Sequence, residues 1–331
     1  MRLFVLLSLF ALVGCQDDQN TAVATTRYIH KYGFDISKEE WESRKQDGFI
    51  ISQLDNQAVK KASYVNGVLQ GHTTYTYPSS SIISKIEEYD DGNLLKTVYN
   101  DLEGNPFKEE LLEFDNRKII TLWDKQGVPM SVEEYQNNIL VKGDYFTQKH
   151  EKEAFIENGA GTRMKRSRDG QLLCKDQIEN GLVVHRMTYH PNGNIQSTAS
   201  FDNYVLNGEQ KTYSPDGNLL TEMMWNHGNP DGMKIVYRNN KVVLKVPYVN
   251  GKRHGLEKAW DDDGRLITRI QWQDDIRHGS SRYYGKEDTQ IDWYYLGKAV
   301  SQQQYRMMEF REKMVAELQE NDYKTEKGYI R

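Results

Sequence analysis

Two things are scarce in this chain: cysteine and long apolar runs. It has 2 cysteines in 331 residues, Cys15 and Cys174, which excludes a disulfide framework. The longest apolar stretch, residues 3–12, is too short to cross a bilayer as a helix. Hydrophobic residues make up only 37% of the chain, and the net charge of -5 argues against nucleic acid as a partner. Aromatic residues are abundant, with 21 Tyr and 6 Trp, so we expect them to replace aliphatic residues in the core.

A turn signal returns every 11 or 12 residues over some 200 residues, usually as Asn-Gly or Asp-Gly. These dipeptides supply the positive φ that a two-residue hairpin turn demands, so each interval is predicted to be one strand and one turn. The chain is therefore predicted to be mostly β, an elongated array of antiparallel β-hairpins with short capping helices at both ends. The best-kept turn glycines are Gly193, Gly217, Gly251 and Gly264.

Successive intervals alternate in kind, so the full period is 23 or 24 residues. An aromatic residue precedes one turn by four positions and the next turn by three. These aromatics are candidates for the structural core or for ligand binding: Tyr189, Tyr213, Trp225, Tyr237, Tyr248, Trp260, Trp272 and Tyr284. A second glycine series keeps the same spacing at Gly208, Gly232, Gly255 and Gly279. Because a lone hairpin cannot bury its apolar face, stability must come from neighbouring repeats.

Side chains are expected to alternate between two faces of each strand. In one well-kept strand, Leu266, Thr268, Ile270 and Trp272 fall on the face predicted to be packed, whereas Arg265, Arg269 and Gln271 fall on the face predicted to be wet.

The segment Tyr213-Ser-Pro-Asp-Gly217, followed by Trp225-Asn-His-Gly228, resembles the MORN repeat in its bacterial variant form. Similar patterns begin at Tyr189 and Tyr248, and the resemblance covers about two thirds of the chain. It implies a ribbon of antiparallel hairpins used for protein interaction or membrane association, with no catalytic residues. Some bacterial relatives are labelled antitoxin-like.

The first residues carry a separate signal. A short basic start precedes the apolar stretch, and Leu12-Val13-Gly14-Cys15 resembles the lipobox of bacterial lipoproteins, whose cysteine is acylated. We therefore predict a signal peptide over residues 1–14, a lipidated Cys15 carrying fatty acids such as palmitate, and a polar tether over 15–27. The expected location is the bacterial cell envelope, anchored to a membrane and either periplasmic or associated with the outer membrane. An ordinary signal peptide that is cut elsewhere is the alternative.

The remaining boundaries are a cap over residues 28–63, hairpin repeats over 64–285, and a C-terminal strand with a capping helix over 286–331. The segment from Ser37 to Glu40 matches a capping box, which predicts the start of a short helix that contains Trp41. Ser301 to Gln304 opens the second helix. That helix is expected to cover the last hairpin through Tyr305, Met308, Met314 and Leu318, with a partner-binding role as the alternative.

The chemistry-bearing residues suggest no catalytic site, no metal site and no cofactor. Cys174 lies within a predicted strand, where a buried packing role is favoured over a nucleophile. His227, His254 and His278 recur before turn glycines, but hairpins in register place equivalent residues about 9.6 Å apart, too far to share one ion.

We therefore predict a membrane-anchored, non-enzymatic repeat scaffold whose partner is an unidentified envelope protein. One alternative is that repeated aromatics form cages for a cell-wall glycan or a quaternary ammonium ligand. Another is an antitoxin or immunity-like role. Exposure of the repeat aromatics distinguishes the first two, because burial between hairpins favours the scaffold and pairs lining open grooves favour the cage.

Overall fold

The computed structural model describes residues 22–328. The predicted signal peptide, Cys15 and most of the tether lie outside the described residues. The described chain forms 27 strands and two helices, in two compact units that divide between Asn138 and Ile139. The fold is mostly β, and all of its strand pairs are antiparallel, as the turn spacing predicts.

The first unit contains ten strands and one helix. Their bounds are β1 (Val23–His30), β2 (Asp35–Ile36), α1 (Lys38–Arg44), β3 (Gly48–Leu54), β4 (Val59–Val65), β5 (Val68–Thr76), β6 (Ile83–Asp90), β7 (Asn93–Asn100), β8 (Pro106–Glu113), β9 (Arg117–Trp123) and β10 (Pro129–Gln136). From β3 onward each strand pairs with the next along the chain, while β1 pairs with both β2 and β3.

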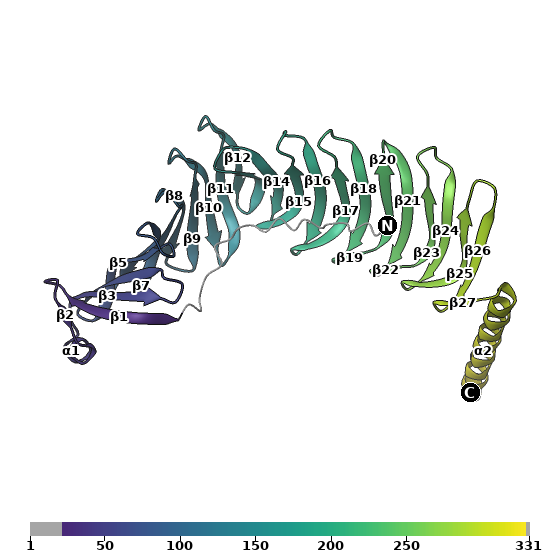
Figure 1. The fold of residues 1–331 in the computed structure, drawn as a ribbon, viewed down its shortest axis with the longest axis horizontal. Helices are drawn as coiled ribbons and strands as arrows, with labels where there is room; N and C mark the ends of the chain where they lie inside the picture. Colours follow the sequence, from purple (N-terminus) through teal and green to yellow (C-terminus); the bar gives the residue numbers. More distant parts are fainter. Residues whose placement is uncertain (1–21, 329–331) are drawn as a thin grey trace. The chain divides into compact units, whose positions relative to one another are not determined.

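The second unit contains the best-kept repeats. Its bounds are β11 (Ile139–Phe146), β12 (Lys152–Glu157), β13 (Ala160–Arg166), β14 (Leu172–Glu179), β15 (Leu182–Tyr189), β16 (Ile195–Asp202), β17 (Val205–Tyr213), β18 (Leu219–Asn226), β19 (Asn229–Pro230), β20 (Gly232–Arg238), β21 (Lys241–Val249), β22 (Lys252–Arg253), β23 (Gly255–Trp260), β24 (Leu266–Gln273), β25 (Ile276–Tyr284), β26 (Thr289–Tyr295), β27 (Lys298–Val300) and α2 (Gln302–Gly328). Figure 1 shows these strands following one another in chain order. Antiparallel pairing is therefore also found outside the 64–285 range expected for the repeats, at β1 in the first unit and at β27 in the second.

Two kinds of turn alternate along the second unit. At Asn250–Gly251 both central residues have positive φ, 49° and 85°, as a two-residue turn requires. The expectation of two-residue turns is wrong at Gly193, Gly217 and Gly264, which instead end longer loops. At Gly217, for example, the amide donates to the Ser214 carbonyl at 2.8 Å, and only the glycine has positive φ. Proline one position after the loop start, as at Pro215, favours this type I geometry.

Neighbouring hairpins are joined at their turns as well as along their strands. The amide of Gly251 donates to the carbonyl of Pro230 at 2.7 Å, and the amide of Gly228 donates to Leu206 at 2.7 Å. Each two-residue turn is thus tied to the strand of the preceding repeat. Stability is shared between adjacent repeats, which is the usual arrangement in repeat proteins.

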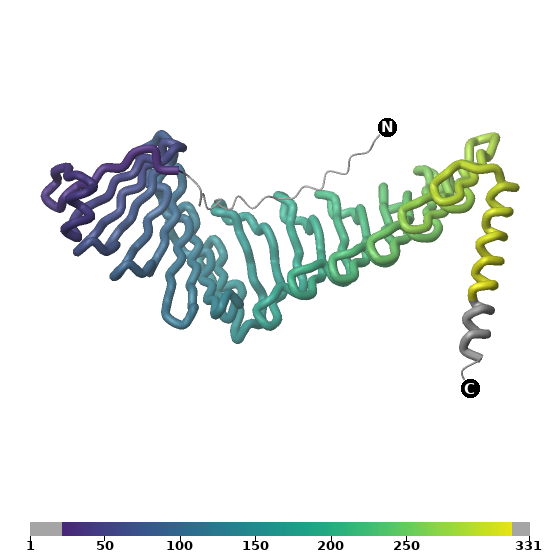
Figure 2. Tube along the Cα trace, turned by 90° about the horizontal axis from the view of Figure 1, so that it is seen from below, coloured from purple at the N-terminus to yellow at the C-terminus, as the bar shows by residue number. Residues whose placement is uncertain are grey.

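Both helix starts predicted from the sequence are confirmed. The Ser37 hydroxyl accepts from the Glu40 amide at 3.1 Å, and Trp41 is buried between the rings of Tyr28 and Tyr64. At α2 the box is complete, because Ser301 Oγ accepts from the Gln304 amide at 3.2 Å and Gln304 Oε1 accepts from the Ser301 amide at 2.8 Å. Figure 2 shows α2 leaving the last hairpin of the second unit.

Candidate functional site: the two faces of the repeat sheet

The second glycine series lies directly opposite aromatic residues. The cross-strand pairs are Gly208 with Trp225, Gly232 with Tyr248, Gly255 with Trp272, and Gly279 with Tyr294. These glycines have φ between 100° and 112°, a conformation that side-chain-bearing residues rarely adopt. A Cβ at these positions would also lie within 3.2–3.3 Å of a side chain on the preceding strand, such as Met224 for Gly232 and Pro247 for Gly255. The spacing that sequence reasoning detected is therefore a pairing of glycine with an aromatic.

One face of this sheet, here called the inner face, carries the buried side chains. It includes Met223, Val246, Ile270 and Trp272, all less than a tenth exposed. The indole of Trp272 donates to Glu257 at 2.9 Å, and the indole of Trp225 donates to Gln210 at 3.0 Å, each 15 residues back along the chain. The opposite side, here called the outer face, carries the alternating residues of the same strands, such as Arg269. The predicted assignment of residues in β24 to a packed and a wet face is confirmed.

The repeat aromatics do not form cages. Of the eight, Trp272 is buried and the other seven are partly exposed. Within the described residues none of the eight makes a ring pair with another aromatic. Arg253 instead covers the Trp272 ring at 3.6 Å from its centroid while binding Asp275 at 2.8 Å, so a protein cation already occupies that ring face.

Tyr237, on the outer face, is also satisfied within the protein. Its hydroxyl donates to Glu222 at 2.8 Å, and this hydrogen bond, with burial and the carboxylate charge, raises the pKa of Tyr237.

A buried ion cluster lies on β13, β14 and β15. The Asp176 carboxylate is fully buried and accepts from Arg163 at 2.7 Å and from Arg186 at 2.7 Å. Burial pushes its pKa upward, but the hydrogen bonds and charges of the two guanidinium groups outweigh burial, so the pKa lies below its ordinary value. Sequence reasoning missed this cluster. The signal was available, because Asp176 is the one acid directly opposite Arg163 across the β13–β14 hairpin.

Cys174 is a buried free thiol on the same strand as Asp176. Burial, followed by the Asp176 charge, raises its pKa. A raised pKa keeps the thiol protonated and weakly nucleophilic. The geometry therefore fits the packing role predicted from its position in a strand.

The recurring histidines have separate partners. His254 lies 3.3 Å from Asp274, and His227 Nδ1 lies 2.7 Å from the Asn226 side chain. His278 packs against Tyr295 and Tyr305. Among the residues that the structure describes, no group of three or more His, Cys, Asp or Glu side chains is placed to hold a metal ion.

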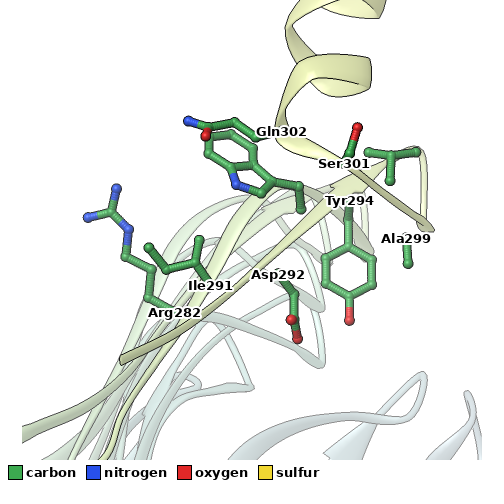
Figure 3. Close-up of a pocket in the computed structure, with 9 residues that line it drawn as sticks. Arg282, Ile291, Asp292, Tyr294, Ala299, Ser301 and Gln302 are labelled. Atoms are coloured by element: carbon green, nitrogen blue, oxygen red, sulfur yellow. The ribbon is translucent and has the colours of Figure 1, made fainter. Parts of the chain in front are cut away.

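A pocket of about 670 Å³ lies where the sheet ends and α2 begins. Figure 3 shows Arg282 and Ile291 pointing to one side of the strands, and Asp292 and Tyr294 pointing to the other. Trp293, Ser301 and Gln302 complete much of the lining. Sequence reasoning missed this pocket, although the predicted helix start at Ser301 marked the end of the sheet.

The C-terminal helix covers the last hairpin only at its first turns. Tyr305 is buried and its ring lies 5.1 Å from that of Trp293. Met314 and Leu318 remain 47% and 60% exposed, so their expected burial against the hairpin is wrong. The physical reason is that α2 contacts little beyond β26, while the helix runs on for several more turns. Over the described part of the chain, neither helix is long and apolar enough to cross a membrane.

Comparison with protein families identifies two repeats. The model of the MORN repeat variant matches residues 184–203 and 206–227, which cover β15 to β18. No curated protein matches the chain.

Comparison with solved structures gives distant likenesses. A crystal structure of TcdB2-TccC3-Cdc42 is 13% identical, with 72% of this chain and 16% of that chain covered and a TM-score of 0.17. A crystal structure of TcdB2-TccC3 is 11% identical, with 78% and 19% covered and a TM-score of 0.18. This chain thus spans less than a fifth of their length, and TM-scores of this size do not indicate a shared fold.

Proposed function

Because the chain contains MORN repeat variants, we propose that it is a non-enzymatic scaffold that binds a protein partner through the outer face of its repeat sheet. Four large apolar side chains on this face carry the proposal: Met224, Met233, Ile267 and Ile291, which are between 37% and 48% exposed. Large apolar side chains exposed on one face of a sheet are a feature of protein interaction surfaces.

We further propose that the scaffold is a lipoprotein of the bacterial envelope, held to a membrane through acyl chains on Cys15. The support is the lipobox-like Leu12-Val13-Gly14-Cys15, preceded by an apolar stretch and followed by polar residues. Several acyl chains, at about 0.8 kcal/mol per buried CH₂ group, anchor a protein stably where one chain does not.

The scaffold is tested by in-cell photocrosslinking from single outer-face positions. A photoreactive residue at Ile267 should capture one abundant protein, whereas the same residue at Thr268, which faces the other way on β24, should not. Equal capture from both positions, or recovery of only wall glycan fragments from Ile267, would contradict the proposal.

The anchor needs its own test. Cys15→Ala should abolish labelling by a fatty-acid probe and release the protein from membranes, with Cys174→Ala as the matched control. Unchanged labelling of the Cys15→Ala variant would refute the lipoprotein assignment, and it would leave the scaffold untouched.

A further inference from the structure

Four cationic residues form a continuous row across the outer face. Lys245 on β21 lies directly opposite Lys258 on β23, which lies opposite Arg269 on β24, which lies opposite Arg282 on β25. Adjacent strands are about 4.8 Å apart, so the row, here called the basic ladder, spans roughly 14 Å. All four side chains are partly buried.

The ladder has no counter-charge. Its members form no ion pair in the part of the chain that the structure describes. Beyond Lys245 the same row of the sheet continues through Ile235 to Glu222, two strands away, and the Glu222 carboxylate accepts from the Tyr237 hydroxyl at 2.8 Å. The nearest outer-face positions along each strand hold no acid: Val243, Pro247, Leu256, Trp260, Ile267, Gln271, Ser280 and Tyr284. At the end of the ladder, the buried Nε of Arg282 has no hydrogen-bond partner and lines the pocket of Figure 3.

Such a row weakens the folded state. Like charges directly opposite each other on a sheet repel, and partial burial reduces the screening by water. A chain with 48 acidic residues has ample acids to pair with four cations, yet none faces them. An anion supplied by a partner would relieve the repulsion.

We propose that the basic ladder binds an α-helix of a partner protein that presents an acidic side chain on each turn. This inference rests on the proposed scaffold function and specifies the partner. The pitch of an α-helix is about 5.4 Å, close to the strand spacing of about 4.8 Å, so one acid per turn meets one cation per strand. Acids on alternate residues of an extended strand are farther apart, at roughly 6.6 Å.

The surroundings of the ladder favour a narrow partner. Acidic turns lie at both ends of these strands, with Asp262 and Asp263 at one end and Asp274 at the other, all exposed. A flat anionic membrane would have to approach these acids in order to reach the ladder. A helix about 10 Å wide can lie along the ladder between them, with apolar contacts to Leu256 and Ile267 on its two sides.

The test measures binding of a synthetic helical peptide to the full chain in detergent solution by fluorescence anisotropy. The peptide carries one Glu per turn between leucines, and the comparison peptide has Gln in place of each Glu. The ladder variant is Lys258→Gln with Arg269→Gln. Its matched control is Lys211→Gln with Arg238→Gln, which removes two outer cations that already have acidic partners, Glu209 and Asp262.

We expect the Glu peptide to bind more tightly than the Gln peptide, and the ladder variant to lose about tenfold in affinity, as for two partly buried charge pairs. The control variant should bind like the wild type. The ladder variant should also melt at a temperature equal to or higher than that of the wild type, because repulsion between the cations is removed. If the double variant is misfolded, the single variant Lys258→Gln replaces it and should show a smaller loss of affinity for the Glu peptide.

Other outcomes overturn the inference. Equal binding of the Glu peptide by the wild type and the ladder variant would remove the ladder from recognition. Ladder-dependent binding to vesicles containing phosphatidylglycerol, without peptide binding, would replace the helix by a membrane surface. Crosslinking from Ile267 that persists in the ladder variant would leave the scaffold function standing while contradicting this partner.

Discussion

At the scale of single residues, the most constrained group is the Asp176 carboxylate. A buried charge is tolerated only when its hydrogen bonds and counter-charges are in place. Here Arg163 and Arg186 supply both, from the strands on either side of β14. Removing the carboxylate would leave two guanidinium groups close together without the anion between them, so this cluster should control the stability of its part of the sheet.

Asp176→Asn should destabilise the protein by about 3–5 kcal/mol near neutral pH, as breaking a buried ion pair does. The pKa of Asp176 is lowered below 3.8 in the folded chain, so the unfolded chain takes up the proton first as pH falls. The contribution is therefore complete above about pH 4 and is lost as pH falls through the lowered folded pKa. Urea unfolding at several pH values checks this.

The control for that experiment is Glu153→Gln, which breaks the less buried pair with Arg166 at 2.7 Å. It should cost less than Asp176→Asn. A difference between wild type and Asp176→Asn that stays constant from neutral to strongly acidic pH would contradict the assigned pKa direction.

At the scale of elements, the two-residue turns differ in how well their residues suit positive φ. Some use Asn or Asp followed by Gly, as at Asn250–Gly251, but the β16–β17 turn uses Asn203 and Tyr204, with φ of 46° and 69°. A tyrosine in this left-handed conformation is strained, by roughly 1–2 kcal/mol. Its ring is 71% exposed, so packing does not compensate.

Tyr204→Gly should therefore stabilise the protein by about 0.5–1 kcal/mol, the relief of strain less the added flexibility of glycine in the unfolded chain. The reciprocal change at the same position of the next repeat, Gly228→Tyr, should destabilise it. Thermal melting followed by circular dichroism measures both. A Tyr204→Gly protein that melts at a lower temperature than wild type would show that this turn is not strained.

Much of the fold could be predicted from the sequence because it depends on local sequence signals. Turn glycines, strand alternation and capping boxes each depend on residues a few positions apart. The basic ladder was missed because its members are 11 to 13 residues apart and meet only after the hairpins are paired. Folding the sequence at its predicted turns would have brought Lys245, Lys258 and Arg269 into one row. The exposure of Met314 and Leu318 could not be inferred, since an amphipathic pattern does not say how far a helix stays in contact with its neighbour.

At the scale of the whole molecule, the repeating unit is a pair of strands. Each pair contains one turn of each kind, and each repeat is tied to the preceding one through strand pairing and turn hydrogen bonds. In such an array stability is approximately a sum over repeats and their interfaces. Removing a whole period should therefore shorten the array while each remaining strand still pairs with a strand of the same kind as before. Removing one strand reverses the direction of every strand that follows.

Deletion of residues 194–217 removes one full period and joins Gly193 to Asn218. The new turn has the sequence Asn-Gly-Asn, the same as residues 192–194, where residues 216–218 have Asp-Gly-Asn. We expect a folded protein with a native-like β circular dichroism spectrum and cooperative melting, because the strands on both sides of the junction meet partners of the same kind as before. Deletion of residues 205–217, which removes β17 and its turn, should give a destabilised or aggregated protein, since β18 would then meet β16 in place of β17 and Trp225 would lose Gly208, the residue opposite it. Comparable melting of the two deletion variants would mean that a single strand, and not the two-strand repeat, is the unit of this fold.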